Sequence, residues 1–261
     1  MIAEDITPLI ITFDEAPNIA RSLGKLLWAK RIVIVDSGST DETLEIIAAY
    51  PQAQIFYHKF SSFADQCNFG LSQIKTDWAL SLDADYELSD DLVREIFELK
   101  DDEAIRGYCA GFTYRIHGRP LRGSLYPPRT VLYRVLNSHY ENEGHGHRVS
   151  ISGNRKLLRG VIYHDDRKPL LRWFRSQQRY AELEAIHLLN SDPKMLTRSD
   201  IIRRAAWPAP VLVTIYVLLI KGCLLDGWAG WFYTLQRLLA ETMIALAVIE
   251  RRLGNLDDQK R

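Results

Sequence analysis

Two carboxylates separated by one small residue, Asp83 and Asp85, follow the apolar run at residues 78–82. Carboxylate oxygens at this spacing can hold one hard cation such as Mg²⁺ or Mn²⁺, which substrate phosphates often complete. On a surface turn the same pair would simply be solvated. Because a buried strand is predicted before the pair and a helix capped by Ser89 after it, the metal site is favoured.

A third acid, Asp36, also ends an apolar run, at residues 32–35, and it precedes Ser37 and Gly38. Asp36 can accept hydrogen bonds from a nucleobase or a ribose, and Gly38 allows a ligand to approach the backbone closely. The alternative is a capped turn before the next helix, which explains Asp41 without requiring Asp36. No glycine-rich dinucleotide or P-loop motif follows a strand, which disfavours oxidoreductases and P-loop enzymes.

These acids need a scaffold that brings them together. Apolar runs at residues 6–12, 32–35, 53–57 and 78–82 alternate with segments of helical spacing. This alternation predicts βαβ units and a mostly parallel sheet flanked by helices. Ligands bind beyond the carboxyl ends of such strands, so the acids are expected along one edge of the sheet. A cation would compensate their mutual repulsion.

The composition excludes several other classes of protein. Of the 261 residues, 47% are apolar and the formal net charge is zero, which excludes a disordered tail, a collagen-like fibre and a bulk polycation. The three cysteines share no close spacing, so neither a disulfide framework nor a zinc knuckle is expected, and a reducing compartment fits. The zero charge hides an asymmetry, because residues 1–100 carry 17 acids and 8 bases.

Three segments, at residues 10–19, 34–43 and 82–85, resemble in order and spacing the signatures of family 2 inverting glycosyltransferases with the GT-A fold. The resemblance covers roughly residues 5–190 and is greatest to the heptose β-1,4-glucosyltransferase-like branch, which adds a sugar to the lipopolysaccharide core. It implies a GT-A-type mostly parallel sheet in a domain at residues 1–190. A C-terminal helical extension, residues 191–261, is expected to follow.

The resemblance also implies roles for individual residues. Asp83 and Asp85 would hold Mg²⁺ or Mn²⁺ on the diphosphate of a nucleotide sugar, with Asp85 the more direct ligand. The other residues assigned to the nucleotide sugar are Thr12, Asp14, Glu15, Asp36 and Ser37. The chain departs from the family at Phe13 and Asp14, where Tyr-Asn is usual, and at Tyr86, where the close branch often has Glu.

The catalytic base is a further departure from the family. The close branch has a His-Glu pair where this chain has residues 143–149, and His147 falls where the glutamate would stand. A histidine can act as the base near neutral pH. Glu143 is the alternative base. In a third interpretation, His145 and His147 are only loop or metal-adjacent residues.

The second half of the chain is basic. Residues 106–179 contain 15 bases and 4 acids, and arginine forks suit phosphate oxygens. Of the arginines between the metal motif and the base, Arg129 is assigned to the nucleotide sugar, although a solvated position at a strand edge is the alternative for any one of them. Nucleic acid is not expected as a partner, because no nucleic-acid motif occurs and the first half is acidic.

The C-terminal region has two apolar segments, at residues 211–220 and 231–249. The first is about half of the roughly 20 residues that span a bilayer, and Arg237 and Glu241 interrupt the second. The two would form a buried helical pair or lie on a membrane surface with Trp207 and Trp228 among the headgroups. The opening residues do not resemble a signal peptide, so a cytoplasmic protein, peripheral at the inner face of the cytoplasmic membrane, is expected.

The sequence therefore predicts a metal-dependent inverting glycosyltransferase. Its donor would be a nucleotide-diphosphate sugar, UDP-linked, and its acceptor a glycolipid or surface polysaccharide such as lipopolysaccharide core. One alternative is a nucleotidyltransferase that makes an activated sugar, although residues 12–17 lack the glycine-rich phosphate loop that it would use. The other is a non-catalytic membrane scaffold that retains a nucleotide-sugar pocket.

Overall fold

The computed structural model describes residues 3–143 and 146–258. The chain forms two compact units: unit 1 comprises Met1–Gly118 and Tyr126–Lys168, and unit 2 comprises Arg119–Leu125 and Pro169–Arg261. The sequence predicted a boundary at residue 190, whereas the compact units divide at residue 168. The difference arises because α5 (Leu170–Asn190) packs against α8 (Gly227–Asp258) and so groups with the C-terminal helices.

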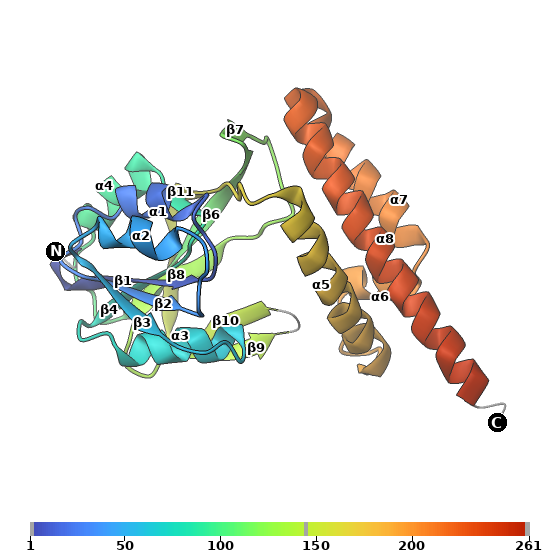
Figure 1. Cartoon of the computed structure of the whole chain (residues 1–261), viewed down its shortest axis with the longest axis horizontal. Coiled ribbons are helices and arrows are strands. Elements are labelled where there is room, and N and C mark those ends of the chain that lie inside the picture. The colour runs from blue at the N-terminus through green and yellow to red at the C-terminus, as the bar shows by residue number, and fades with distance from the viewer. Residues whose placement is uncertain (1–2, 144–145, 259–261) are drawn as a thin grey trace. The chain divides into compact units, whose positions relative to one another are not determined.

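A twisted sheet forms the centre of unit 1 (Figure 1). Its strands, in spatial order, are β3 (Ala53–Tyr57), β2 (Ile32–Asp36), β1 (Ile6–Thr12), β4 (Trp78–Asp83), β8 (Arg129–Arg134), β6 (Ile105–Ile116), β11 (Asn154–His164) and β5 (Tyr86–Leu88). The first four strands pair in parallel, as predicted. The strands β4, β8 and β6 then pair antiparallel, β6 and β11 parallel, and β11 and β5 antiparallel.

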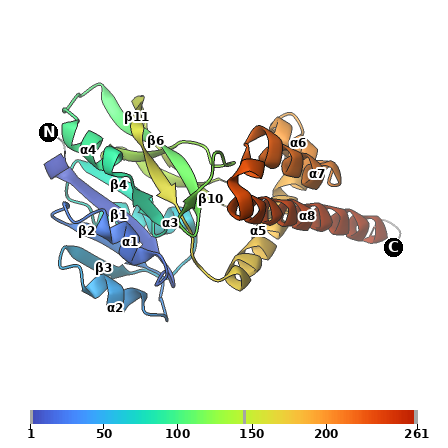
Figure 2. The ribbon, with the colours of Figure 1, turned by 90° about the horizontal axis from the view of Figure 1, so that it is seen from above.

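Alternate side chains of the buried strands enter two cores, one on each face of the sheet. Ile10 and Ile34 pack with α1 (Ile19–Gly24), α2 (Thr43–Ala48) and α4 (Asp90–Glu98). Leu9 and Val33 pack on the other face with α3 (Phe63–Ser72) and the hairpin of β9 (His139–Glu143) and β10 (Gly146–Ser150). The sheet is therefore covered on both faces (Figures 1 and 2), and the carboxyl ends of its strands are left for ligands.

Unit 2 is helical apart from the short strand β7 (Arg119–Pro120). After α5 come α6 (Arg198–Arg204), α7 (Pro208–Ile215), the π-helical turn η2 (Tyr216–Ile220), the 3-10 turn η3 (Cys223–Asp226) and α8. Within this unit α8 packs against both α5 and α7. Buried Glu241 of α8 pairs with Arg203 of α6 at 2.6 Å, which fixes the helices without leaving a lone buried charge.

One glycine allows α4 to lie close against β11. A Cβ added at Gly160 would stand 2.4 Å from Cα and 2.5 Å from the backbone nitrogen of Leu92, which cannot move without displacing α4. We expect Gly160→Ala to destabilise unit 1 by about 1–3 kcal/mol, as overpacking commonly does. Thermal and urea unfolding would measure this loss.

The matched control is Gly24→Ala at the end of α1, where an added Cβ meets nothing within 4 Å. This variant should unfold at the same temperature and urea concentration as the wild type, or at slightly higher ones. Equal stability of the two variants would show that the α4–β11 contact does not require glycine.

Candidate active site

The carboxyl ends of three parallel strands meet at one edge of the sheet. In the register of these strands Thr12 pairs with Asp36, and Ile11 pairs with Asp83. The acids at the ends of β2 and β4 are therefore separated by β1 alone. Asp85 lies two residues beyond β4, in the turn that leads into β5. The predicted gathering of acids along this edge is confirmed.

Asp85 is largely buried and hydrogen-bonds to His164. Its Oδ2 lies 3.2 Å from Nε2 of His164, and the two side chains are 12% and 14% exposed. Burial alone would raise the pKa of Asp85, but the His164 imidazole and the Lys168 ammonium outweigh it and hold this pKa well below its usual range. Burial likewise opposes the charge of His164, and Asp85 raises the pKa of that imidazole above its ordinary value. Asp85 is thus an ionised carboxylate.

The Lys168 side chain joins the loop after β1 to the segment after β11. Its Nζ lies 2.5 Å from Oε1 of Glu15, and the amide of Asn18 donates to the other Glu15 oxygen at 2.8 Å. Burial raises the pKa of Glu15 to about 7, although Lys168 opposes that shift, and the nearby charge of Asp85 adds to it. The carboxylate of Glu15, which the sequence assigns to the nucleotide sugar, accepts hydrogen bonds from Lys168 and Asn18.

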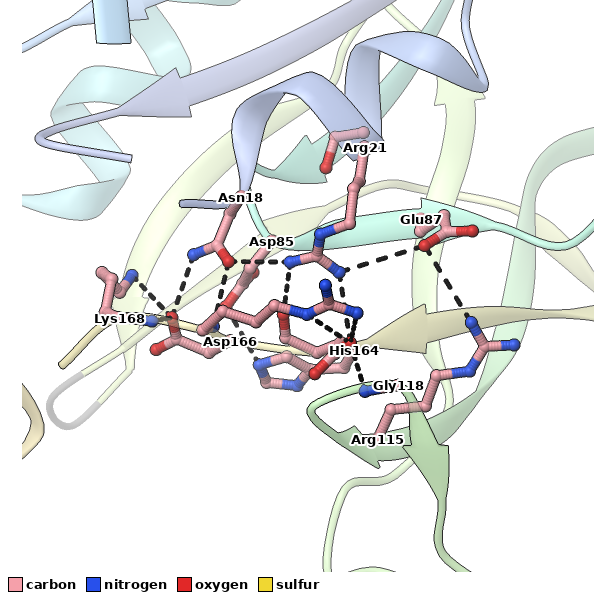
Figure 3. Close-up of polar contacts among 12 residues, drawn as sticks. Asn18, Arg21, Asp85, Glu87, Arg115, Gly118, His164, Asp166 and Lys168 are labelled. Carbon is pink, nitrogen blue, oxygen red and sulfur yellow. Dashed lines mark hydrogen bonds and ion pairs between the residues drawn. The ribbon is translucent and has the colours of Figure 1, made fainter. Parts of the chain in front are cut away.

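A second set of contacts anchors the same segment. Asp165 is fully buried, and its Oδ2 accepts hydrogen bonds from Arg21 at 3.3 Å, from Arg167 at 2.8 Å and from the backbone of Gly118 at 2.9 Å. The backbone carbonyl of Asp165 accepts a further bond from Arg21 at 2.7 Å. These contacts hold residues 164–168 against α1, where the His164 imidazole hydrogen-bonds to Asp85 (Figure 3) and the Lys168 ammonium is close enough for its charge to lower the pKa of Asp85.

The loops after β1 and β2 are bonded to each other. Asp36 is buried, and its carboxylate accepts from the backbone of Gly38 at 2.8 Å and of Ser39 at 2.9 Å. Asp14 has a φ of 50° and accepts from the backbone of Thr40 at 2.7 Å. The carboxylates of Asp36 and Asp14, both assigned to the nucleotide sugar, thus brace these loops.

Two further residues assigned to the nucleotide sugar lie beside these loops. The backbone N–H of Ser37 donates to the carbonyl of Thr12 at 3.1 Å. The hydroxyl of Thr12 is buried and has no hydrogen-bond partner in the described part of the chain. A buried hydroxyl without a partner is costly, so a ligand that bonds to it would relieve that cost.

His147, the predicted base, lies on β10 between the rings of Phe63 and Tyr140, with centroid distances of 5.6 and 5.3 Å. Burial lowers the pKa of His147 below its ordinary value; the charge of Asp83 raises it and that of Arg129 lowers it. His147 is therefore neutral near pH 7 and lies within electrostatic reach of the metal motif. The side chain of Glu143 and the whole of His145 lie outside the described residues.

Arg129 begins β8 near the same motif. Its guanidinium lies 4.6 Å over the ring of Tyr126, whose hydroxyl hydrogen-bonds to that of Tyr86. Burial raises the pKa of Tyr126, and the charge of Asp83 adds to this effect while Arg129 opposes it. Arg129 and Asp83 thus both lie close enough to Tyr126 to change the pKa of its phenol.

His164 and Lys168 were not predicted from the sequence. The signal for His164 was present, because it ends a strand as Asp36 and Asp83 do. Lys168 had no comparable signal in the sequence, because a position within a long basic stretch does not indicate which acid the lysine contacts. Another arginine of that stretch, Arg134, is structural, bonding to Asp101 at 2.6 Å and lying over the ring of Trp78.

The donor atoms at this edge fit a hard divalent cation. No group of three His, Cys, Asp or Glu side chains arranged for a metal ion occurs within residues 3–143 and 146–258. Mg²⁺ and Mn²⁺ on a phosphorylated substrate need only one or two carboxylates, because the phosphates supply other ligands. Asp83 and the ionised Asp85 meet that requirement.

Comparison with solved structures supports the fold. The S. aureus TarS 1-349 structure in complex with UDP-GlcNAc superposes with a TM-score of 0.50 at 15% sequence identity, covering 95% of this chain and 92% of the TarS 1-349 chain. Similarity at this level concerns the fold alone. It confirms the predicted GT-A-type sheet with a C-terminal helical extension.

Comparison with curated proteins identifies relatives in sequence. An uncharacterized glycosyltransferase of Rickettsia bellii is 36% identical over 146 residues, which cover 54% of this chain and 48% of that protein. The lipopolysaccharide core biosynthesis glycosyltransferase LpsC of Rhizobium meliloti is 30% identical over 121 residues, covering 42% of this chain and 45% of LpsC. The chain thus spans about half the length of these relatives.

The family comparison covers more than half of the chain. Residues 8–162 match the model described as glycosyl transferase family 2, and this range includes most of β1, all of β4, the Asp83 and Asp85 pair and His147. The parallel strands, the acids at their ends and this match agree with one another. The chain belongs to the family 2 glycosyltransferases.

Proposed function

We propose that this protein is a metal-dependent inverting glycosyltransferase whose donor is a nucleotide-diphosphate sugar, UDP-linked. The observation that carries the proposal is the buried, ionised carboxylate of Asp85 beside Asp83, within electrostatic reach of a neutral histidine. Membership of family 2 supports the reaction type. The donor class agrees with the UDP-GlcNAc bound by TarS, which shares the fold.

On the donor side, Asp83 and Asp85 would hold Mg²⁺ or Mn²⁺. When bound, such a cation supplies Lewis-acid stabilisation of the leaving diphosphate. His164 and Lys168 keep Asp85 ionised and oriented, so its oxygens need no rearrangement when the donor arrives. Arg129 brings a guanidinium to the same region, where it can bind phosphate oxygens. The buried hydroxyl of Thr12 is available to the nucleoside.

On the acceptor side, inversion requires one displacement at the anomeric carbon, and a base takes the proton of the attacking hydroxyl. We assign this role to His147, since burial keeps its imidazole neutral and able to accept a proton. Glu143 remains the alternative base. The acceptor we propose is a glycolipid or surface polysaccharide such as lipopolysaccharide core, in line with the name of LpsC.

The proposed location is the cytoplasm, at the inner face of the cytoplasmic membrane. One helical stretch, Cys223–Gly254, is long and apolar enough to cross a bilayer by length and composition, and a third of its most apolar window is buried within the protein. A helix that packs partly on its own protein and partly faces outward suits a peripheral position on the membrane.

Nucleotide sugars should stabilise the purified protein. A ligand at a concentration of about 100 times its Kd raises the free energy of unfolding by about 2.7 kcal/mol. A thermal-shift panel of UDP-, GDP- and ADP-sugars, with and without Mn²⁺, should therefore give a metal-dependent increase in Tm with UDP-sugars. Stabilisation by a nucleoside triphosphate with a sugar phosphate instead would support a nucleotidyltransferase, and donor binding without transfer would support a scaffold.

Replacing Asp85 should abolish metal-dependent transfer. Asp85→Asn keeps the shape of the side chain and removes its charge, so we expect a loss of about 100-fold or more in kcat/KM, worth about 2.7 kcal/mol or more. Isothermal calorimetry should show that Mn²⁺ no longer strengthens donor binding. The control is Asp90→Asn, whose carboxylate is 81% exposed. Transfer by Asp85→Asn at the wild-type rate would remove this residue from the mechanism.

The pH profile should report on His147. Its pKa lies below the ordinary value of about 6.5, so kcat should be constant at neutral pH and fall at lower pH, as protonation removes the base. His147→Gln should lower kcat by about 10²–10⁴-fold, change KM little and abolish this acid limb. His139→Gln on the neighbouring strand, where the imidazole is 58% exposed, is the control. An unchanged acid limb in His147→Gln would transfer the role to another group.

A further inference from the structure

Unit 2 exposes large apolar side chains along α7, η2 and α8. Val211, Ile215 and Leu219 follow one another at four-residue spacing along α7 and η2, so they fall on one side of the helix. Trp207, just before α7, is 76% exposed, Leu219 63% and Ile220 70%, values far from those of a helix that packs on a core. We call these side chains, together with Trp228 and Trp231 of α8, the apolar face.

Among residues 227–254 of α8, whose burial the structure describes, the buried side chains lie on one side of the helix. Ala245 and Val248 are buried with Ala185 and Leu188 of α5. Exposed apolar residues of α8 recur at spacings of three, four or seven residues, at Trp228, Trp231, Leu235, Leu239, Leu246 and Ile249. Figure 2 shows α7 and α8 beside each other in unit 2, as their contacts also indicate. Large exposed apolar patches of this kind mark protein or membrane interaction sites.

The charges around the apolar face are one-sided. Between residues 207 and 249 the only acids are Asp226 and Glu241, whose side chains are 7% and 8% exposed and which pair with Arg122 and Arg203. The cations near the face point over its aromatic rings: Lys221 lies 5.5 Å from the ring centroid of Tyr216, and Arg119 lies 5.4 Å from that of Trp228. The face therefore presents apolar and aromatic groups and positive charge, with almost no exposed carboxylate.

We propose that the apolar face of unit 2 lies in the interfacial layer of an anionic lipid bilayer, with α7 and α8 along the membrane surface. Tryptophan and tyrosine suit the headgroup level, and nearby bases attract anionic lipids. The proposal deepens the proposed function and rests on it in one respect, since a glycolipid acceptor would be presented at that surface. Its evidence comes from unit 2 alone.

Two other placements fit the same residues less well. If Cys223–Gly254 crossed the bilayer, Arg237 and Glu241 would stand near its middle, where charges are expensive. If a second copy of the chain covered the face about a twofold axis, identical patches would meet, bringing Lys221 and Arg119 of both copies together without exposed acids to compensate them.

Vesicle flotation of the full chain tests the proposal. Phosphatidylcholine vesicles with 30% phosphatidylglycerol should carry the protein upward, pure phosphatidylcholine vesicles should carry less, and the difference should shrink as salt rises. The double variant Leu219→Glu/Ile220→Glu should reduce partitioning by about 10-fold or more, because it removes two exposed apolar side chains from the contact. The control Leu136→Glu/Leu157→Glu changes side chains of unit 1 that are 79% and 67% exposed and should float like the wild type.

Circular dichroism and nucleotide-sugar binding, measured on the same preparations, separate this proposal from the proposed function. If the double variant loses flotation but still binds the nucleotide sugar, the membrane proposal is supported. If the wild-type protein floats but binds no nucleotide sugar, the proposed function fails while the membrane proposal stands. The proposal is overturned if wild-type protein does not float, if the double variant floats like the wild type, or if phosphatidylglycerol and salt have no effect. A dimer in vesicle-free buffer that the double variant dissociates would assign the face to a second copy and overturn it as well.

Discussion

The candidate site depends on keeping one buried carboxylate, Asp85, ionised. A carboxylate removed from water is unfavourable unless positive groups lie close to it. His164, the last residue of β11, and Lys168, just beyond it, provide them from about 80 residues further along the chain. Residues 164–168 are held by the parallel pairing of β11 with β6 and by the bonds of Asp165 to Arg21 and Gly118. The metal motif thus depends on β11, which comes late in the chain, as much as on β4, which leads into it.

Several bases pair with acids inside the protein, both within and between the two halves of the chain. Lys168 pairs with Glu15, Arg21 with Asp165, and Arg134 with Asp101. These bases neutralise neighbouring carboxylates, so they are not simply a reserve of charge for substrate phosphates. The same distinction applies to unit 2, where Asp226 and Glu241 are paired and shielded while the bases stay near the apolar face. These ion pairs decide which charges remain to act on a ligand. The net charge of the chain does not show which charges those are.

Each unit of the chain concentrates one kind of surface. Unit 1 collects polar and ionised groups at a strand edge, whereas unit 2 exposes apolar helix faces. For a glycosyltransferase acting on a glycolipid, the two surfaces would serve the two substrates, one soluble and charged, the other embedded in a membrane. A helix that buries only one face is only marginally stable alone, so α5 and α8 pack together. Because α5 belongs with α8, the compact units divide near residue 168 and not near residue 190.

The parallel strands, the acids at their carboxyl ends and the family could be predicted from the sequence, because period, strand-end position and motif order are local properties that the fold preserves. The family pattern also suggested His147 as the base, and in the folded chain it lies close enough to Asp83 for their charges to interact. The hydrogen bonds by which Asp36 and Asp14 brace their loops, and the effects of His164 and Lys168 on Asp85, could not be predicted in this way. Those pairings join residues far apart in the chain, and their energies depend on burial and distance, which no local pattern of residues encodes.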